Sequence, residues 1–170
     1  MSPELERLRA GHAPALLAFE LENRDYFAKS ISDRGDAFFL EFDERLAMLL
    51  AEQADGICHF HVLVEADGSI VGRVNLIDVT DGSAELGYRI AERAAGRGVA
   101  TAAVRAVCAL AAADYALSSL TARTTLDNAA SRTVLERTGF TVVGETVITG
   151  KPGLRFVREL AAEAAPGVVT

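Results

Sequence analysis

Two Asp-Gly pairs, at residues 67–68 and 81–82, join three segments that have the composition of β-strands. The segments are 59–66 (HFHVLVEA), 69–79 and 84–90. Asp-Gly between such segments favours a tight hairpin turn, because both residues tolerate the positive φ angles that the turn requires. We therefore predict a three-stranded antiparallel meander, against which the rest of the chain has to pack.

The chain on either side of the meander supplies further helices and strands. Apolar residues recur at helical spacing over 13–24 and 41–53, and a helix that is apolar on nearly every face follows Gly96-Arg97-Gly98. The other predicted elements are a strand at 5–10, the apolar helix at 99–117, a strand at 120–125, a helix at 128–138, and strands at 140–149 and 154–160. We predict an α+β (mixed α/β layered) fold in a single domain over 1–161, with a mobile tail at 162–170.

Composition excludes several classes of protein. Hydrophobic residues make up 50% of the 170 residues, which excludes an intrinsically disordered chain. The net charge of −7 disfavours nucleic-acid binding and suits a cationic acceptor such as an amine, although acidity is also a common route to solubility. No apolar run reaches the roughly 20 residues of a membrane span, and we expect no signal peptide. Two cysteines without a CxxC spacing favour a reducing compartment, so we expect a cytoplasmic protein.

A strand-to-helix junction with two glycines is the first candidate site. Gly96 and Gly98 follow the strand that ends at Ile90, and the apolar helix opens at once. Glycines let the backbone approach a ligand, and the first turn of a helix presents unpaired N–H groups. Together these features predict an anion site for phosphate on the N–H groups of residues 96–101. The alternative is a loop whose glycines only turn the chain.

The second candidate is the segment 126–140, LDNAASRTVLERTGF. Asn128 can cap the helix, and Ser131 and Leu135 share a face with it. Arg132 and Arg137 lie on adjoining faces, from which they could meet phosphates. The alternative is a plain cap with a small packing serine and solvated arginines.

Taken together, AELGYRIAERAAGRGVATAAV and, some 20 residues later, NAASRTVLERTGF resemble the GNAT superfamily of N-acetyltransferases. The resemblance covers roughly residues 4–160 and is strongest to the ribosomal-protein-alanine N-acetyltransferases. ENRDYF, at residues 22–27, looks like the acceptor-side helix of that branch. In the family's diphosphate motif, Gln/Arg-x-x-Gly-x-Gly/Ala, Gly98 and Ala100 match the last two positions, whereas Ala95 replaces the Gln/Arg.

The resemblance implies a GNAT-like fold, with a twisted, mostly antiparallel sheet of about seven strands and about four helices. It implies that the strand ending near Ile90 and the strand at 120–125 splay apart around acetyl-CoA, the co-substrate, with no metal. The pantetheine arm would pair with the backbone of 88–90, the diphosphate would lie on 97–101, Asn128 would reach the arm, and Ser131 would lie near the sulfur. The predicted cofactor-binding residues are Tyr88, Arg89, Ile90, Gly96, Arg97, Gly98, Val99, Ala100, Thr101, Asn128 and Arg132.

The expected reaction is direct attack of a neutral primary amine on the thioester in a ternary complex. We predict Glu85 as the base, directly or through water, and Ser131 as the proton donor to the thiolate; a cross-strand surface charge and a packing serine are the alternatives. Asn23, Arg24 and Tyr26 are the predicted acceptor-pocket residues. His59 and His61 share a strand face, for which we expect packing or a polar patch and not a metal site, and we expect Phe38, Phe39 and Phe42 to pack the helical insert.

The favoured acceptor is the α-amine of a protein N-terminus. A small amine (an antibiotic, a polyamine or an amino acid) and a non-catalytic acyl-CoA-binding module are the alternatives. The expected partners are therefore an amine acceptor and, as one option, a second copy of the chain in a homodimer. Neither nucleic acid nor a membrane is an expected partner.

Overall fold

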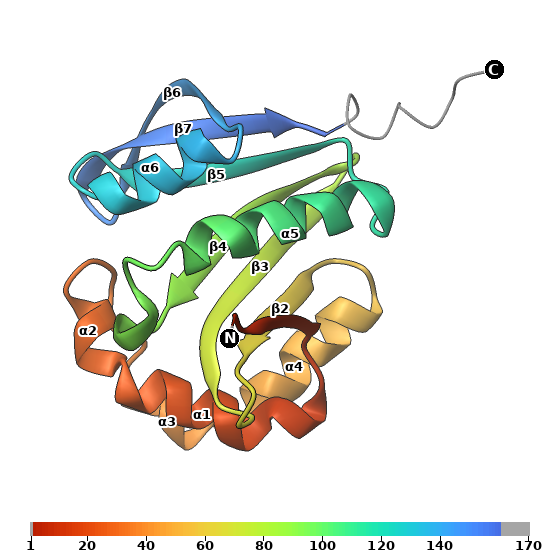
Figure 1. Cartoon of the computed structure of the whole chain (residues 1–170), viewed down its shortest axis with the longest axis vertical. Helices are drawn as coiled ribbons and strands as arrows, with labels where there is room; N and C mark the ends of the chain where they lie inside the picture. Colours follow the sequence, from red (N-terminus) through yellow and green to blue (C-terminus); the bar gives the residue numbers. More distant parts are fainter. Residues whose placement is uncertain (1, 161–170) are drawn as a thin grey trace. The chain divides into compact units, whose positions relative to one another are not determined.

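The computed structural model describes residues 2–160, and the tail predicted at 162–170 lies outside the described residues. Contacts within the chain divide it into two compact units that share β3 (Ile70–Thr80) and β4 (Ser83–Ile90). The first unit runs to Asn75 and includes Tyr88–Val99. The second unit comprises Leu76–Gly87 and the chain from Ala100 onward. Figure 1 follows the elements along the chain.

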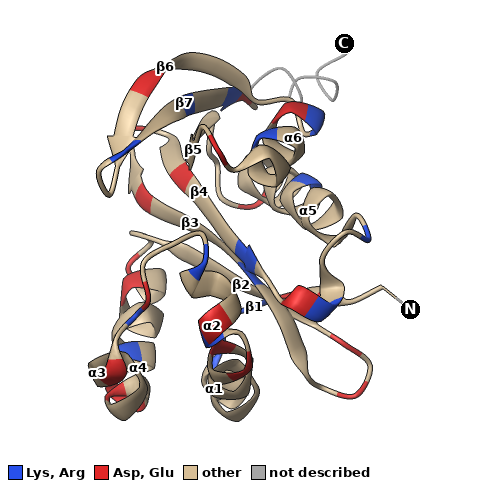
Figure 2. Cartoon of the chain, turned by 90° about the vertical axis from the view of Figure 1, so that its left-hand side faces the viewer, with Lys and Arg blue, Asp and Glu red and all other residues tan. Residues whose placement is uncertain are grey.

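The first unit contains the N-terminal helices. Its remaining elements are β1 (Glu4–Arg7), η1 (Ala10–His12), α1 (Ala13–Glu22), α2 (Arg24–Ala28), α3 (Asp36–Leu40), α4 (Phe42–Ala54), β2 (His59–Val64) and η2 (Glu92–Ala94). Its core combines one face of α1 with the strands, and the most deeply buried members include Leu16, Phe19, Val62, Val71 and Val74. Acidic residues stand out on α3 and α4 (Figure 2). Asp36, Asp43 and Glu44 lie in the first turns of these helices, where their negative charges interact favourably with the positive ends of the helix dipoles.

The second unit packs helices against the C-terminal strands. Its remaining elements are α5 (Val99–Ala113, with Val99 assigned to the first unit), β5 (Ser119–Thr125), α6 (Ala129–Arg137), β6 (Thr141–Ile148) and β7 (Lys151–Glu159). The fully buried residues Val104, Val107, Leu120, Leu135 and Phe156 form its core. In Figure 1, α6 lies against β5.

The seven strands of residues 2–160 form one sheet in the order β1-β2-β3-β4-β5-β7-β6, which agrees with the predicted α+β architecture and its sheet of about seven strands. β1 with β2, β5 with β7, and β6 with β7 are antiparallel, whereas β4 and β5 are parallel. The parallel pair is joined by α5, because parallel neighbours need a crossover connection.

The described residues contain six α-helices, where the sequence predicts about four. The predicted helix at 13–24 ends at Glu22 and is followed by the short α2, and Gly35, with φ of 86°, precedes α3. The helix predicted to reach residue 117 ends at Ala113, because Ala116 adopts a left-handed φ of 53° and the Leu117 N–H returns to the Ala111 carbonyl at 2.9 Å. The phenylalanines of the insert pack as predicted: the Phe38 ring lies 5.1 Å from that of Phe39 and 5.8 Å from that of Phe42.

His61 is a buried histidine whose role is structural. Its side chain is 1% exposed, and Nδ1 lies 3.1 Å from the Val74 carbonyl oxygen, which it meets as a donor. Burial lowers the pKa of His61 to about 4, with smaller opposing and supporting effects from Val74 and Arg7. Between a pH of about 4 and a pH of about 6.5, this ring is therefore neutral in the folded protein, whereas it is protonated in the unfolded chain.

This pKa difference predicts a loss of stability in mild acid. The contribution of His61 is fully present above the unfolded pKa of about 6.5 and is lost as the pH falls from there toward 4, at a cost of roughly 3 kcal/mol. We expect His61→Gln, which keeps a donor for Val74 but does not titrate, to flatten the decline in the free energy of unfolding over this range. Urea denaturation at several pH values measures it, and an unchanged decline in the variant would contradict the assignment.

Candidate active site

The glycine loop before α5 has the geometry of a backbone cradle. Gly96 and Gly98 both adopt φ of 74°, a left-handed conformation that favours glycine, and both are exposed. A Cβ added at either position would meet no described atom within 4 Å, so the space beside the backbone is open. α5 begins at Val99, immediately after the loop, and its first-turn N–H groups point out of the helix N-terminus. An open, exposed backbone at the positive end of a helix dipole fits the diphosphate of a coenzyme A thioester.

The pairing of β4 with β5 ends early. It covers Ser83–Glu85 against Ser119–Thr121, although β4 continues to Ile90 and β5 to Thr125. β5 pairs with β7 along its whole length, so the pairing of β5 is interrupted only on the edge that faces β4. Within residues 2–160, the register between these two strands therefore ends before the β4 segment that the family resemblance assigns to acetyl-CoA.

The N-terminus of α6 is capped as the sequence predicts. The Asn128 side-chain oxygen accepts a hydrogen bond from the Ser131 N–H at 3.1 Å, which brings these two predicted site residues together. Arg132 donates to the Leu126 carbonyl at 3.0 Å, and its buried Nε is one of two buried side-chain polar atoms without a partner among the described residues. Arg132 therefore braces the loop before α6 through one end of its guanidinium group.

Glu85 forms an ion pair on the surface of the sheet. Arg123 Nε donates to Glu85 Oε2 at 2.6 Å, and the Glu85 side chain is 24% exposed. The two residues come from neighbouring strands: Glu85 of β4 belongs to the last register pair, with Thr121, and Arg123 lies two residues further along β5. The predicted base is thus oriented by an arginine that the sequence analysis did not single out.

Asn23, predicted to line the acceptor pocket, is 6% exposed and bonded at both ends of its amide. Its Nδ2 donates to the Phe19 carbonyl at 2.9 Å, and its Oδ1 accepts from the Glu92 N–H at 3.0 Å. Asn23 therefore ties the end of α1 to the segment that leads into the glycine loop. Tyr26 lies beside Phe27, with the ring centroids 5.8 Å apart, and does not line the pocket described next.

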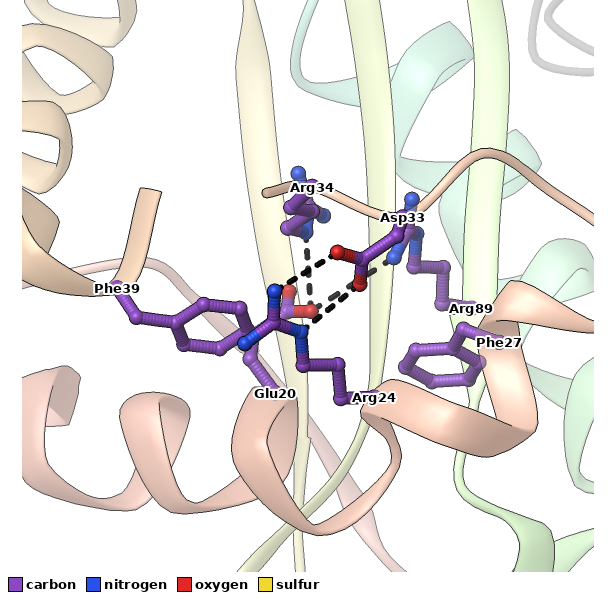
Figure 3. A pocket seen from close by; sticks show the side chains of 7 residues that line it. All are labelled: Glu20, Arg24, Phe27, Asp33, Arg34, Phe39 and Arg89. Atoms are coloured by element: carbon purple, nitrogen blue, oxygen red, sulfur yellow. Dashed lines mark hydrogen bonds and ion pairs between the residues drawn. The ribbon is translucent and has the colours of Figure 1, made fainter. Parts of the chain in front are cut away.

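Arg24 lies in a pocket of the first unit (Figure 3). Its guanidinium group binds Asp33 through two bonds of 3.0 and 2.8 Å, donates to Asp36 at 2.8 Å, and stacks 4.5 Å from the centroid of the Phe39 ring. The bonds from Arg24, more than any other contact, lower the pKa of Asp33 to about 2. The pocket, here called the Arg24 pocket, is lined by Glu20, Arg24, Phe27, Asp33, Arg34, Phe39 and Arg89.

Beneath Arg24, three arginines converge on one buried carboxylate, that of Glu20, which is 1% exposed. Arg73 Nη1 donates to Glu20 Oε2 at 2.6 Å, Arg34 Nε donates to Oε1 at 3.0 Å, and Arg89 Nη1 lies 3.7 Å from Oε1. Dashed lines from Arg34 and Arg89 meet at Glu20 in Figure 3. This Glu20 cluster (Glu20, Arg34, Arg73 and Arg89) is absent from the sequence analysis. The one feature of the sequence that could have indicated this cluster is a glutamate on the apolar face of α1, four residues after Leu16 and one after Phe19.

The predicted site residues divide between the two units. The first unit holds the predicted acceptor residues Asn23, Arg24 and Tyr26, and the cofactor residues Tyr88, Arg89, Ile90, Gly96, Arg97, Gly98 and Val99. The second unit holds Glu85, Ala100, Thr101, Asn128, Ser131 and Arg132. Within residues 2–160, no three His, Cys, Asp or Glu side chains are grouped to hold a metal ion, and no helix is long and apolar enough to cross a membrane.

Comparison with known families decides the class of this site. The acetyltransferase (GNAT) domain matches residues 4–141 of the chain. The chain belongs to the GNAT acetyltransferase family. This acetyltransferase is 29% identical over 136 residues to the probable N-acetyltransferase YjcK of Bacillus subtilis (strain 168), a match that covers 73% of this chain and 72% of the relative.

Solved structures agree with the family. The ribosomal-protein-S5-alanine acetyltransferase of Vibrio fischeri superposes on the acetyltransferase with a TM-score of 0.87 at 20% identity, covering 94% of this chain and 96% of that one. Mycobacterium smegmatis RimJ, solved with CoA-disulfide, gives a TM-score of 0.82 at 26% identity, covering 95% of this chain and 83% of that one. The predicted resemblance to the ribosomal-protein-alanine branch is therefore confirmed at the level of structural similarity.

Proposed function

We propose that this acetyltransferase transfers the acetyl group of acetyl-CoA to the α-amine of a protein N-terminus, by direct attack in a ternary complex. The observation that carries the co-substrate assignment is the open backbone at Gly96 and Gly98 in front of α5. The similarity to RimJ, which was solved with CoA-disulfide, supports the same assignment. Similarity to a ribosomal-protein-S5-alanine acetyltransferase supports a protein N-terminus as the acceptor.

The local geometry supports an assignment of the residues that would hold the co-substrate. The N–H groups of Gly98, Val99, Ala100 and Thr101 would bind the diphosphate, with the Arg97 side chain beside them. The main chain of Tyr88–Ile90 would pair with the pantetheine arm, as the family resemblance implies, and in the described residues the register of β4 with β5 runs only from Ser83 to Glu85. Asn128 would orient the arm from the cap of α6.

Proton transfer is the chemical task left to side chains, since the co-substrate supplies an acetyl group already activated as a thioester. At pH ~7.4 roughly a quarter of an α-amine of pKa ~7.8 is neutral, whereas a lysine of pKa ~10.4 is about 0.1% neutral. An α-amine therefore needs only a modest base. Glu85, oriented by Arg123, accepts the amine proton directly or through water, and the Ser131 hydroxyl gives a proton to the departing thiolate; solvent water then returns a proton to Ser131 and takes one from Glu85. A main-chain N–H of residues 88–90 stabilises the charge that develops on the carbonyl oxygen.

Two substitutions test these proton transfers. We expect Ser131→Ala and Glu85→Gln each to lower kcat by at least about 100-fold, the lower end of general acid–base effects. Steady-state kinetics with acetyl-CoA and an N-terminal peptide measures both. Thr133→Ala is the matched control, because Thr133 is an exposed hydroxyl on the same helix that bonds only the Ala129 carbonyl. A loss of less than about threefold removes that residue from the proton pathway.

The acceptor is tested by free-thiol release from acetyl-CoA with a panel of amines. The panel contains peptides that begin with Ala or Ser, the same peptides with a blocked N-terminus and an internal lysine, spermidine and free amino acids. We expect turnover with the unblocked peptides only. Faster turnover with spermidine or an amino acid would replace the protein acceptor by a small amine. Tight CoA binding without any turnover would indicate an acyl-CoA-binding module.

A further inference from the structure

We infer that the Arg24 pocket binds a carboxylate of the acceptor, so that the acetyltransferase prefers amines that carry a nearby negative charge. This inference rests on the proposed function and specifies its acceptor. The pocket belongs to the first unit, and Arg89, one of its lining residues, lies in the β4 segment proposed to hold the pantetheine arm. An acceptor anchored on Arg89 is therefore held by the same strand segment as the co-substrate.

The first argument is the charge balance in the Glu20 cluster. Three guanidinium groups share the single carboxylate of Glu20, and when Arg24 is counted with Asp33 and Asp36, the four positive charges at the pocket still exceed the three negative ones by one. Buried charges without a partner are costly, so a site of this kind attracts a counter-ion. Burial, and next the neighbouring charge of Arg34, lowers the pKa of Arg89 to about 10, in line with an excess of positive charge at this place.

The second argument is which groups face the pocket. Arg73 is covered, but the side chains of Arg34 and Arg89 are 26% and 20% exposed and line the pocket wall. Arg34 donates to Glu20 through Nε, and Arg89 Nη1 lies 3.7 Å from Glu20, beyond hydrogen-bond distance. Each guanidinium group also lies over a ring, 4.6 Å from Phe38 for Arg34 and 5.1 Å from Phe27 for Arg89, which holds it in place. Two fixed guanidinium groups with further donors are suited to a carboxylate.

The third argument concerns the acidic groups of the same pocket. Both oxygens of Asp33 accept bonds from Arg24, and Oδ2 also accepts from the Gly35 N–H. The oxygens of Glu20 are occupied by the arginines below. An incoming ammonium group would therefore meet carboxylates that already have partners. An incoming carboxylate would instead meet the remaining N–H donors of Arg34 and Arg89. The pocket favours an acidic acceptor over a polyamine.

The carboxylate has two chemical sources, an acidic side chain beside the N-terminal residue of a peptide, or the α-carboxylate of a free amino acid. Peptide amides beginning Ala-Glu and Ala-Gln, free glutamate and spermidine separate these sources. We expect kcat/KM for the Ala-Glu peptide to exceed that for the Ala-Gln peptide by about tenfold, the size of one hydrogen bond between charged groups. If free glutamate is the better substrate, the α-carboxylate is the source: the carboxylate preference then stands, and a small amine replaces the protein N-terminus as the acceptor.

Arg34→Gln tests the pocket directly. We expect it to bring the ratio of kcat/KM for the two peptides close to one while the rate with Ala-Gln stays within about threefold, and Arg34→Lys to restore part of the ratio. A purely structural role of Arg34 would lower both rates equally and leave the ratio unchanged. Arg45→Gln, the same change at an exposed arginine of α4 that also lies over the Phe38 ring, is the matched control and should keep the ratio.

The outcomes separate this inference from the proposed function. Turnover of both peptides at equal rates by the wild-type protein overturns the carboxylate preference and leaves the proposed function standing. Absence of turnover with any amine overturns the proposed function. In that case calorimetric binding of the two peptides to the CoA-loaded protein still decides the preference, since equal affinities overturn it and tighter binding of Ala-Glu supports it.

Discussion

Gly98→Val is expected to weaken the binding of CoA by about 100-fold while the protein stays folded. Gly98 adopts φ of 74°, where a β-branched residue is strained, and a Cβ added there meets no described atom within 4 Å, so there is room for the new side chain to begin. The valine would instead fill the space that the diphosphate needs to reach the backbone. The loss of one or two charge-assisted hydrogen bonds, each worth about 1.5–3 kcal/mol, accounts for the expected factor. Isothermal titration calorimetry with CoA measures it.

Gly68→Val is the matched control for this substitution. Gly68 has φ of 88°, lies in the turn between β2 and β3, and has equally open space beside it. The control introduces the same backbone strain away from the glycine loop, so we expect a similar decrease in melting temperature and an unchanged affinity for CoA. Equal loss of affinity in both variants, or in neither, would contradict the assignment of the glycine loop.

Glu20→Gln is expected to lower the free energy of unfolding by about 3–5 kcal/mol, the cost of removing one partner of a buried ion pair. The substitution leaves Arg73, whose side chain is 6% exposed, without its counter-charge, and removes the group that Arg34 and Arg89 surround. Urea denaturation at pH 7 measures the change. Glu22→Gln is the matched control, because it removes the same charge from an exposed position of α1 and should change stability by less than about 0.5 kcal/mol.

A double substitution separates the ion pair from the packing around it. The double variant Glu20→Leu with Arg73→Met removes both the carboxylate and the guanidinium group, so Arg73 is not left buried without its partner. We therefore expect the double variant to be more stable than Glu20→Leu alone. A loss below about 1 kcal/mol in Glu20→Gln, or no recovery in the double variant, would show that the Glu20 cluster does not stabilise the first unit.

The Glu20 cluster also makes the free energy of unfolding depend on pH in acid. Burial raises the pKa of Glu20, but Arg73 and Arg34 outweigh it, and the pKa lies below its usual value. Stability from this carboxylate is therefore present above the unfolded pKa of about 4.3 and is lost as the pH falls through the lower folded value. Glu20→Gln should be less stable at pH 7 and should lose less of its remaining stability in acid.

Local patterns in the sequence predict much of the fold and part of the site. The two Asp-Gly turns, the glycines before α5 and the Asn128 cap each depend on residues close together in the chain, and the structure has all of them. Positive φ at Gly96 and Gly98 also follows a local rule, since glycine adopts it at little cost. These features place the main-chain parts of the candidate site.

Pairs of residues far apart in the chain could not be predicted in the same way. Glu20 and Arg73 are 53 positions apart, and Glu85 and Arg123 are 38 apart, so no periodicity connects them. The breaks around α2 and α3 depend on how Asn23 and Gly35 are held by their neighbours. Asn23, predicted as an acceptor-pocket residue, also accepts a hydrogen bond from Glu92, 69 positions away in the chain. Charged side chains on apolar faces, Glu20 on α1 and Arg73 on β3, are the one signal that points to such a cluster.

The central claim is that the main-chain N–H groups at the start of α5 bind the diphosphate of acetyl-CoA. A crystal structure of the wild-type protein with CoA tests it most directly. We predict diphosphate oxygens within about 3 Å of the N–H groups of Gly98, Val99, Ala100 and Thr101, with the thiol end beside Ser131. A diphosphate bound anywhere else on the chain would contradict the proposed co-substrate site and the mechanism built on it.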